Sequence, residues 1–323
     1  MEHLALVHQV FYRACHVLDR NLWIDAVLIE QIDPVGAQPL EHSLDHQFDV
    51  LRAAVEARLA LTRLKIDVPA ELGGDDDLVA ERLDAFVSDC DAVLHFAGVN
   101  RASPEEVEAG NRDAAQALVD ALERTEAVPH VVFANSTHAE GETPYGRAKR
   151  DAAGLLTDWS IRRNARFTDL VLPHLFGECG RPGYNMVTAT LCHARAHGEV
   201  PALTEGAEVE LLHAGVAVER ALDAVATGDA GRIRLEGRHI SVEALDRRIA
   251  EFHALYSAGV FPDLSEAFDL ELFNTYRSHI APEAWARPIE VKRDARGHLF
   301  EAAKGGGGGQ SFMSSTVPGV TRG

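Results

Sequence analysis

The chain has 323 residues, of which 46% are hydrophobic and 25% charged, and its formal net charge is −19. This length allows two domains, or one large α/β domain with an appendage. The acidic excess argues against nucleic acid or an anionic membrane as the main partner, because both require clustered lysine and arginine.

Cysteine usage and hydropathy indicate the compartment. Cys15, Cys90, Cys179 and Cys192 show no metal-ligand or redox spacing, which is typical of reduced thiols in a cytoplasmic protein. No apolar run approaches the ~18–20 residues of a membrane helix, and the N-terminal segment has no small-residue cleavage site. We therefore expect a cytoplasmic protein with no membrane contact and no metal.

The clearest part of the sequence alternates helical and strand patterns. Helical patterns cover 75–90, 103–126 and 145–163, and strand patterns cover 91–98, 130–136 and 167–177. Ser103, followed by two glutamates, is a good helix cap. Strands alternating with helices of this length indicate βαβ units. The sequence therefore predicts an α/β fold, a doubly wound parallel sheet of the Rossmann type.

The remaining segments suggest the other domains. We expect a Rossmann core over 75–230, a small, mostly helical substrate cap over 231–286 and a Gly-rich, incomplete β-tail over 287–323. Residues 1–74 are an atypical start of the Rossmann domain. They lack the GxGxxG turn that brings backbone N–H groups to a pyrophosphate.

Three residues are predicted to end neighbouring strands. Gly98, Ser136 and Pro173 close the three strand patterns. Because right-handed crossovers place parallel strand ends at one edge of the sheet, where ligands bind, these residues indicate a site. Pro173 is equally compatible with simply terminating its strand.

The sequence TPYGRAK places Tyr145 and Lys149 four residues apart. On a helix this spacing puts both side chains on one face. An ammonium group near a phenol lowers the pKa of the phenol, so the tyrosine can exchange a proton while hydride moves to or from the neighbouring carbon. Ser136 can hydrogen-bond the same substrate oxygen. By itself the YxxxK motif is a weak signal, and a surface helix after a buried strand is the plain alternative.

Several segments resemble the extended short-chain dehydrogenase/reductases, which are Rossmann enzymes acting on nucleotide sugars. The matching segments are HFAG (95–98), Asn111, VVFANS (131–136), YGRAK (145–149) and LPHLFG (172–177). The short spacing in NSTHAEGETPYGRAK, together with the segments around 172–200 and 262–282 and the tail from 287, resembles one branch more closely. That branch is the bifunctional capsular-polysaccharide enzymes with a reductase domain and a metal-binding cupin epimerase domain.

The resemblance implies roles for individual residues. Tyr145 would protonate the C4 oxygen of a UDP-4-keto-6-deoxy-N-acetylhexosamine, Lys149 would lower the Tyr145 pKa and hold the nicotinamide ribose, and Ser136 would position the carbonyl. The implied cofactor-binding residues are Ala97, Gly98, Asn111, Tyr145, Lys149 and Pro173. Asn185 would face the sugar nucleotide. Asn111 and Asn185 are also compatible with purely structural roles.

The same resemblance implies NADP(H) rather than NAD(H), a UDP-sugar substrate in N-acetyl-L-fucosamine precursor synthesis, and a homodimer. The chain differs from the family pattern at Gly215 and Val216, where acidic residues are usual, and it ends before the histidine-rich cupin strands, so we expect the epimerase half to be missing. Two other functions remain open: a nucleotide-sugar 4-epimerase or dehydratase, and a catalytically silent Rossmann-like binding protein.

Overall fold

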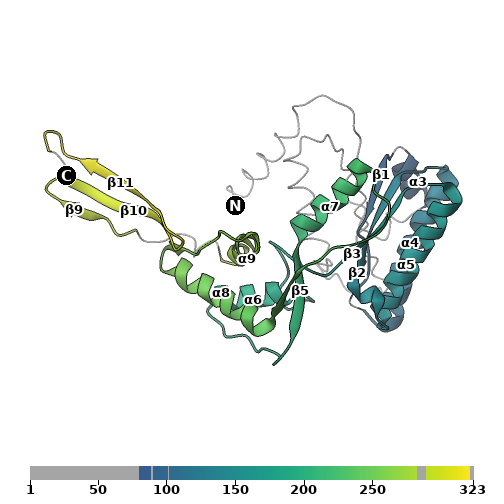
Figure 1. Cartoon of the computed structure of the whole chain (residues 1–323), viewed down its shortest axis with the longest axis horizontal. Helices are drawn as coiled ribbons and strands as arrows, with labels where there is room; N and C mark the ends of the chain where they lie inside the picture. The colour runs from purple at the N-terminus through teal and green to yellow at the C-terminus, as the bar shows by residue number, and fades with distance from the viewer. Residues whose placement is uncertain (1–79, 89, 101, 282–288, 321–323) are drawn as a thin grey trace. The chain divides into compact units, whose positions relative to one another are not determined.

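The computed structural model describes residues 80–88, 90–100, 102–281 and 289–320. The chain forms two compact units (Figure 1). Of the described residues, the first unit holds those up to Leu175 together with Ala214–Gly237, and the second holds Phe176–His213 and those from Arg238 onward. The predictions made for residues 1–74, including the missing glycine turn, lie outside the described residues.

The first unit is built on a parallel sheet in the order β1-β2-β3-β6. Its described elements are α3 (Ala80–Ser88), β1 (Ala92–His95), α4 (Pro104–Thr125), β2 (His130–Ser136), η1 (Thr137–Glu140), α5 (Pro144–Arg163), β3 (Phe167–Leu172), α7 (Ala214–Thr227) and β6 (Gly231–Arg234). Figure 1 shows α3, α4 and α5 on one side of the sheet and α7 on the other. The predicted α/β class is confirmed.

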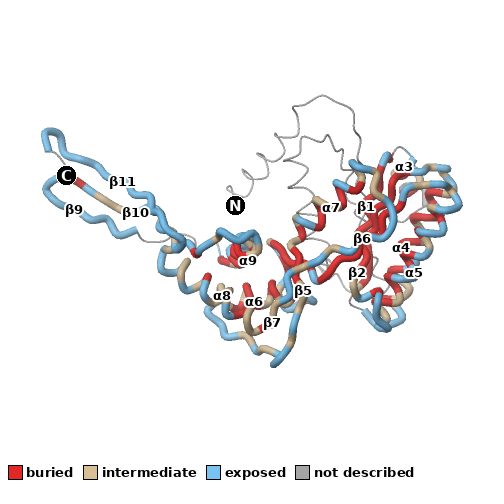
Figure 2. The backbone as a smooth tube through the Cα atoms, in the orientation of Figure 1, coloured by how far each residue is buried: buried red, intermediate tan, exposed pale blue. Residues whose placement is uncertain are grey.

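Local sequence explains where the α4 crossover begins and why the sheet is buried. Ser103 Oγ accepts from the Glu106 backbone N–H, and the Ser103 N–H donates to Glu106 Oε2 at 2.8 Å, which completes a capping box. Strands β1, β2 and β3 are buried on both faces, as Figure 2 shows, because helices cover each side, whereas the edge strand β6 is mostly exposed. The core centres on Leu118, Phe133 and Trp159, each at most 1% exposed.

The second unit packs three helices beside a small sheet in the order β4-β5-β7. Its elements are β4 (His174–Phe176), which begins at the end of the first unit, and α6 (Val187–Ala196), β5 (Glu208–His213), β7 (Arg238–Ser241), α8 (Val242–Ser257) and α9 (Ala267–Ser278). Its core includes Leu245, Phe252 and Phe273. Two arginine–aspartate pairs join the helices: Arg195 contacts Asp246, and Arg248 contacts Asp269.

The glycine-rich tail forms antiparallel strands. β9 (Lys292–Asp294) and β11 (Gln310–Thr316) both pair with β10 (Gly297–Gly305), which also meets the short β8 (Val260–Phe261). Every residue of β11 is exposed, and the tail is pale blue over most of its length in Figure 2. This matches the predicted β-tail without a core of its own, because hairpin pairing satisfies the backbone locally.

The boundaries of the compact units differ from those predicted from the sequence. Residues 176–213, expected in the Rossmann core, group with the second unit because β5 pairs with β7. The segment from Gly231 to Gly237, expected in the cap, belongs to the first unit because β6 extends the parallel sheet beside β3.

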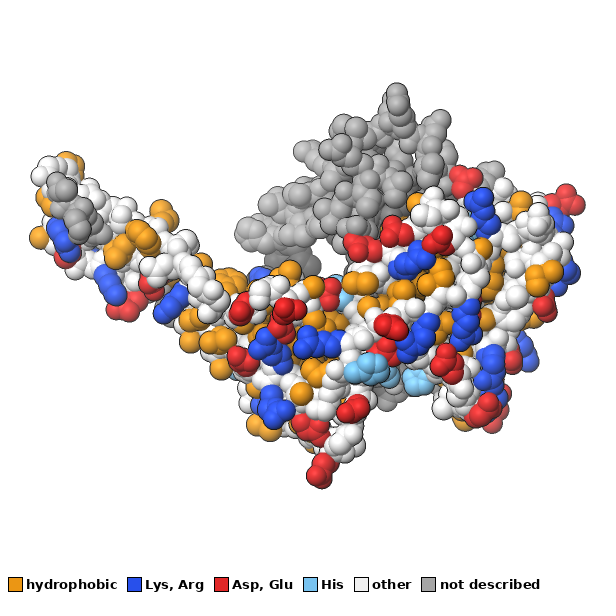
Figure 3. Space-filling model, viewed as in Figure 1, with side chains coloured by type: hydrophobic (Ala, Val, Ile, Leu, Met, Phe, Trp, Pro, Cys, Tyr) orange, Lys and Arg blue, Asp and Glu red, His pale blue; other side chains and the backbone are white. Residues whose placement is uncertain are grey.

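Charges of both signs are interspersed on the face of the molecule that Figure 3 shows. Many arginines pair with carboxylates, for example Arg124 with Asp84 at 2.7 Å and Arg162 with Glu123 at 3.1 Å. Among the described helices, none is both long and apolar enough to cross a bilayer.

Candidate active site

The carboxyl ends of β1, β2 and β3 carry most of the predicted site residues. The strands are parallel and in register, with His95 beside Phe133 and Ser136 beside Leu172. Ala97 and Gly98 follow β1, Ser136 ends β2, and the buried Pro173 separates β3 from β4. The structure therefore brings these predicted residues to one edge of the sheet.

The loop after β1 is closed around Gly98. A Cβ at position 98 would lie 2.5 Å from Asn111 Oδ1 and 3.0 Å from Lys149 Nζ, so a side chain does not fit there. Asn111 is 2% exposed, and its Nδ2 donates to the carbonyls of Val99 at 2.5 Å and Val107 at 2.8 Å. Asn111 thus fastens the loop to α4. Its Oδ1 is buried and has no hydrogen-bond partner among the described residues.

The start of α5 is shaped by η1. The Thr143 hydroxyl accepts from the Gly146 N–H at 3.0 Å and caps the helix. A Cβ at position 146 would overlap the His138 carbonyl oxygen, so glycine is required next to Tyr145 for η1 to pack against the helix.

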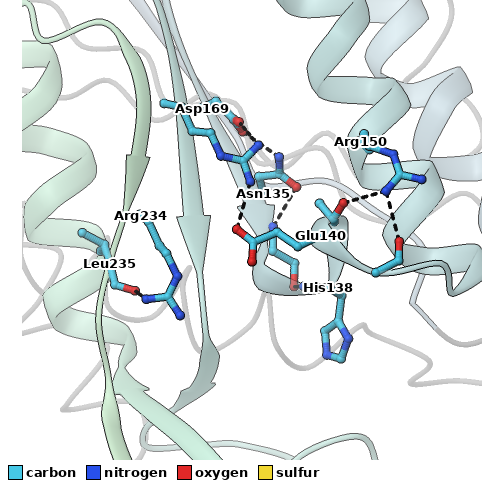
Figure 4. Close-up of polar contacts among 11 residues, drawn as sticks. Asn135, His138, Glu140, Arg150, Asp169, Arg234 and Leu235 are labelled. Atoms are coloured by element: carbon cyan, nitrogen blue, oxygen red, sulfur yellow. Dashed lines mark hydrogen bonds and ion pairs between the residues drawn. The ribbon is translucent and has the colours of Figure 1, made fainter.

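Two arginines of the same helix fix its orientation. Arg147 Nε donates to Glu108 Oε1 on α4 at 3.0 Å, and Arg147 Nη1 donates to the Glu142 carbonyl at 2.6 Å. Arg150 Nη1 donates to the carbonyls of Ala139 at 2.9 Å and Gly141 at 3.1 Å (Figure 4). The helix is therefore tied to both α4 and the η1 turn.

Lys149 is the most unusual side chain of the site because its ammonium group is buried. The residue is 1% exposed, and Nζ donates to the Ala134 carbonyl at 3.1 Å. Nζ lies 4.8 Å from the centre of the Phe133 ring and 5.9 Å from that of Tyr145. The predicted shared face of Tyr145 and Lys149 is present, and the positive charge lies beside the phenol ring.

His95, at the end of β1, lies beside this ammonium group. It is fully buried, and both ring nitrogens lack a hydrogen-bond partner among the described residues. Burial, assisted by the positive charge of Lys149, lowers the pKa of His95 to about 3. The imidazole is therefore neutral, and it adds no second positive charge next to Lys149.

Ser136 is held by its neighbours in a defined orientation. Its N–H donates to Asn135 Oδ1 at 2.8 Å, and its Oγ accepts from the His138 N–H at 3.2 Å. The hydroxyl therefore keeps its proton for an acceptor oxygen. Tyr145 is half-buried, and its ring meets the edge of the His138 ring at 6.0 Å between centroids.

Asn185 lies in the second unit, in the loop before α6. It is exposed and has a φ of 51°, a left-handed conformation that asparagine tolerates better than most residues. This backbone conformation accounts for an asparagine at position 185 without any ligand.

The sequence reasoning missed a polar network beneath Ser136, which Figure 4 shows. Asn135 Nδ2 donates to Asp169 Oδ1 at 2.7 Å, and Arg232 lies 3.4 Å from Asp169 Oδ2 and 3.3 Å from Glu140 Oε1. The signal available in the sequence was the pair of polar residues inside otherwise apolar strands, at Asn135 and Asp169.

We searched the described residues for side chains that could bind a metal ion. There, no group of three or more histidine, cysteine, aspartate or glutamate side chains is arranged to hold a metal ion.

Comparisons with known proteins agree with this geometry. No protein-family model matches the chain. It is 29% identical over 251 residues to a UDP-2-acetamido-2,6-beta-L-arabino-hexul-4-ose reductase of Pseudomonas aeruginosa. The aligned residues make up 75% of this chain and 66% of that relative. The chain therefore spans slightly less than two thirds of that relative's length.

Solved structures show the same fold. The capsular polysaccharide assembling protein CapF from Staphylococcus aureus superimposes with a TM-score of 0.70 at 23% identity, covering 84% of this chain and 74% of CapF. A UDP-N-acetylglucosamine 4-epimerase from Bacillus cereus gives 0.55 at 18% identity, covering 63% of this chain and 78% of the epimerase. These likenesses show that the chain has the same α/β fold as CapF and the 4-epimerase.

Proposed function

We propose that the chain reduces the 4-keto group of a UDP-linked 6-deoxy-N-acetylhexosamine with a nicotinamide cofactor. The observation that carries the proposal is the buried Lys149 ammonium group beside the Tyr145 ring, at the strand edge where Ser136 ends β2. The name of the Pseudomonas relative, a reductase of a UDP-linked 4-keto sugar, supports this substrate class.

The chain's residues fit a nicotinamide cofactor at the β1 edge. Asn111 Oδ1 and Lys149 Nζ lie directly against Gly98, so two polar side chains flank the loop after β1. We infer that Ala97 and Gly98 line the cofactor, that Lys149 and Tyr145 hold its ribose hydroxyls, and that Pro173 packs nearby. The reduced cofactor, when bound, supplies a hydride to C4. NADP(H) is the preferred form in this proposal.

The protein residues handle the proton and the oxygen. Ser136, whose hydroxyl proton remains for an acceptor, donates a hydrogen bond to the C4 carbonyl oxygen and fixes its position. Tyr145 gives its phenolic proton to that oxygen as the C4 alkoxide forms. Lys149 stabilises the resulting phenolate by its positive charge. Asn185 is proposed to contact the sugar nucleotide. The product would feed N-acetyl-L-fucosamine synthesis for capsule or O-antigen.

The proposal is tested with purified protein, NADPH or NADH, and a UDP-4-keto-6-deoxy-N-acetylhexosamine. Loss of absorbance at 340 nm, equal in amount to the product formed, is the expected result. Tyr145→Phe should lower kcat by about 10²–10⁴-fold, the usual contribution of a positioned acid. Tyr256→Phe, which removes a hydroxyl from the second unit, is the matched control and should retain activity.

Other outcomes identify the alternatives. Conversion of a UDP-sugar without net NADPH consumption would indicate a 4-epimerase or dehydratase instead. Absence of NADPH binding at millimolar concentration in a calorimetric titration would overturn the reductase proposal and favour a catalytically silent Rossmann-like binding protein.

A further inference from the structure

The strand bearing Ser136 is linked to its neighbours by a directional chain of hydrogen bonds. Asn135 on β2, Asp169 on β3 and Arg232 on β6 lie on three adjacent parallel strands. Asn135 is 3% exposed and Asp169 is 7% exposed, so the contact between them is buried. Arg232, half of whose side chain is exposed, brings a positive charge to Asp169 from the edge strand.

The charge of Asp169 determines which way the Asn135 amide points. An ionised carboxylate only accepts hydrogen bonds, so the Asn135 NH₂ group must face Asp169 Oδ1, at 2.7 Å. The amide carbonyl then faces the opposite way, where it accepts the Ser136 N–H at 2.8 Å. A neutral group at position 169 removes this constraint, because it can also donate and allows the amide to turn over.

The orientation of the amide matters because Ser136 is the last residue of β2. Its backbone N–H is held by Asn135, and its Oγ accepts from the His138 N–H at 3.2 Å. With both contacts in place, Oγ is held at the end of β2 while its hydroxyl hydrogen stays available to a further acceptor. If the Asn135 carbonyl turns away, Ser136 loses one of the two contacts that define its position.

We propose that Asp169 is a positioning residue: its carboxylate, paired with Arg232, orients the Asn135 amide and thereby sets Ser136 for hydrogen bonding to the substrate carbonyl. The role of Ser136 rests on the proposed function, whereas the link from Asp169 to Ser136 does not. Asp169 touches neither substrate nor cofactor and acts through Asn135.

The surroundings of Asp169 give this role a pH dependence. Burial raises the pKa of Asp169, while the hydrogen bond from Asn135 and the charges of Arg232 and Lys149 oppose the rise. Glu140 faces the other side of Arg232, at 3.3 Å. The carboxylate form orients the amide, so the effect is present above the Asp169 pKa and is lost as the pH falls through it. Removing the positive charge of Arg232 should move this loss to higher pH.

The first test compares Asp169→Asn with the exposed control Asp158→Asn on α5. Asp169→Asn should lower kcat roughly tenfold, the effect of one lost directional hydrogen bond in a site, and leave the Kd for NADPH unchanged. Asp158→Asn should leave both values unchanged. In the wild type, kcat should fall as the pH is lowered through the Asp169 pKa; we call this fall the acid limb of the kcat profile. In Asp169→Asn the acid limb should be absent.

A second variant keeps the test informative if Asp169→Asn fails to fold. Arg232→Gln changes a half-exposed side chain and should shift the acid limb of kcat to higher pH, while Arg232→Lys, which preserves the charge, should restore the limb. A merely structural arginine would change stability without moving this limb. An unmoved limb in Arg232→Gln would contradict the proposal.

A third measurement does not depend on activity. The Ser136 amide proton should exchange with solvent roughly tenfold faster in Asp169→Asn than in the wild type, measured by NMR, because its acceptor is no longer held. Unchanged exchange in Asp169→Asn overturns the positioning role even if the wild type reduces the 4-keto sugar. Faster exchange in a wild type that lacks reductase activity would support the link and refute only the proposed function.

Discussion

Replacing Gly98 by alanine tests whether the loop after β1 is as tightly closed as the structure indicates. The added methyl group would lie 2.5 Å from Asn111 Oδ1 and 3.0 Å from Lys149 Nζ. Asn111 cannot simply withdraw, because its Nδ2 group is bonded to the carbonyls of Val99 and Val107. Either those two hydrogen bonds lengthen or the Lys149 ammonium group moves.

The magnitude follows from these contacts. Overfilling a packed site costs typically 1–3 kcal/mol, and each weakened buried hydrogen bond about 1 kcal/mol. We expect Gly98→Ala to lose about 2–3 kcal/mol of unfolding free energy, which lowers the midpoint of thermal unfolding by roughly 3–5 °C in a protein of this size. Since Lys149 lies beside the proposed cofactor, NADPH affinity should fall as well.

Circular dichroism melting of the two proteins, with calorimetric titration of NADPH, measures both effects. Gly154→Ala is the matched control: it lies in α5, and an added Cβ has no atom within 4 Å. That variant should gain about 0.5–1 kcal/mol from helix propensity. A Gly98→Ala protein that melts with the wild type or above it would refute the close packing of Gly98, Asn111 and Lys149.

Three further predictions concern buried groups. Lys149→Met should reduce kcat at least a hundredfold while leaving the melting temperature equal or higher, because an apolar side chain of similar length replaces a buried ammonium group. Burial lowers the pKa of His95 to about 3 and that of His279 to about 4, whereas an unfolded histidine has a pKa of ~6.5. Above pH 6.5 both states are neutral and the free energy of unfolding is not reduced; below it only the unfolded state binds the proton. That stability falls by roughly 1.4 kcal/mol per pH unit as the pH drops toward each folded value; urea unfolding at pH 7 to 5 should show a shallower slope in His95→Phe. Iodoacetamide at neutral pH should label the exposed Cys179 and leave Cys192 unmodified, since burial raises the pKa of that thiol; peptide mass mapping distinguishes them.

Periodicity and caps predicted the elements of the first unit well. Ser103 begins the helix that its capping box indicated, and the run at 130–136 is β2 to the residue. These features depend on contacts between residues close in sequence, so local reasoning reaches them. The unit boundaries depend on which distant strands pair, and the β6 strand joined β3 against expectation because that pairing leaves no local signature.

Site residues that belong to a sequence motif could be predicted, whereas those brought together only by the pairing register of the strands could not. Ser136 ends β2, and Lys149 Nζ lies 5.9 Å from the centre of the Tyr145 ring, while the catalytic roles of the three residues stay predictions. Asp169 becomes meaningful only when the sheet register places it near Asn135, and that register is not written in either strand alone. The sequence singled out Asn111 but did not predict its hydrogen bonds. In the structure its Nδ2 group donates to the backbone carbonyls of Val99 and Val107.

The motif around Tyr145 contains residues that packing explains and one that packing does not. Gly146 is required by the His138 carbonyl, Arg147 ties the helix to Glu108, and Arg150 binds the η1 carbonyls. These contacts would serve a silent protein equally well. Lys149 differs, because burying an ammonium group carries a desolvation cost of several kcal/mol. Its contacts include the Ala134 carbonyl and the Phe133 ring. A buried positive charge beside a phenol has a chemical use when that phenol must become a phenolate during turnover. For this reason the kcat of Lys149→Met, measured together with its stability, discriminates between the two functions.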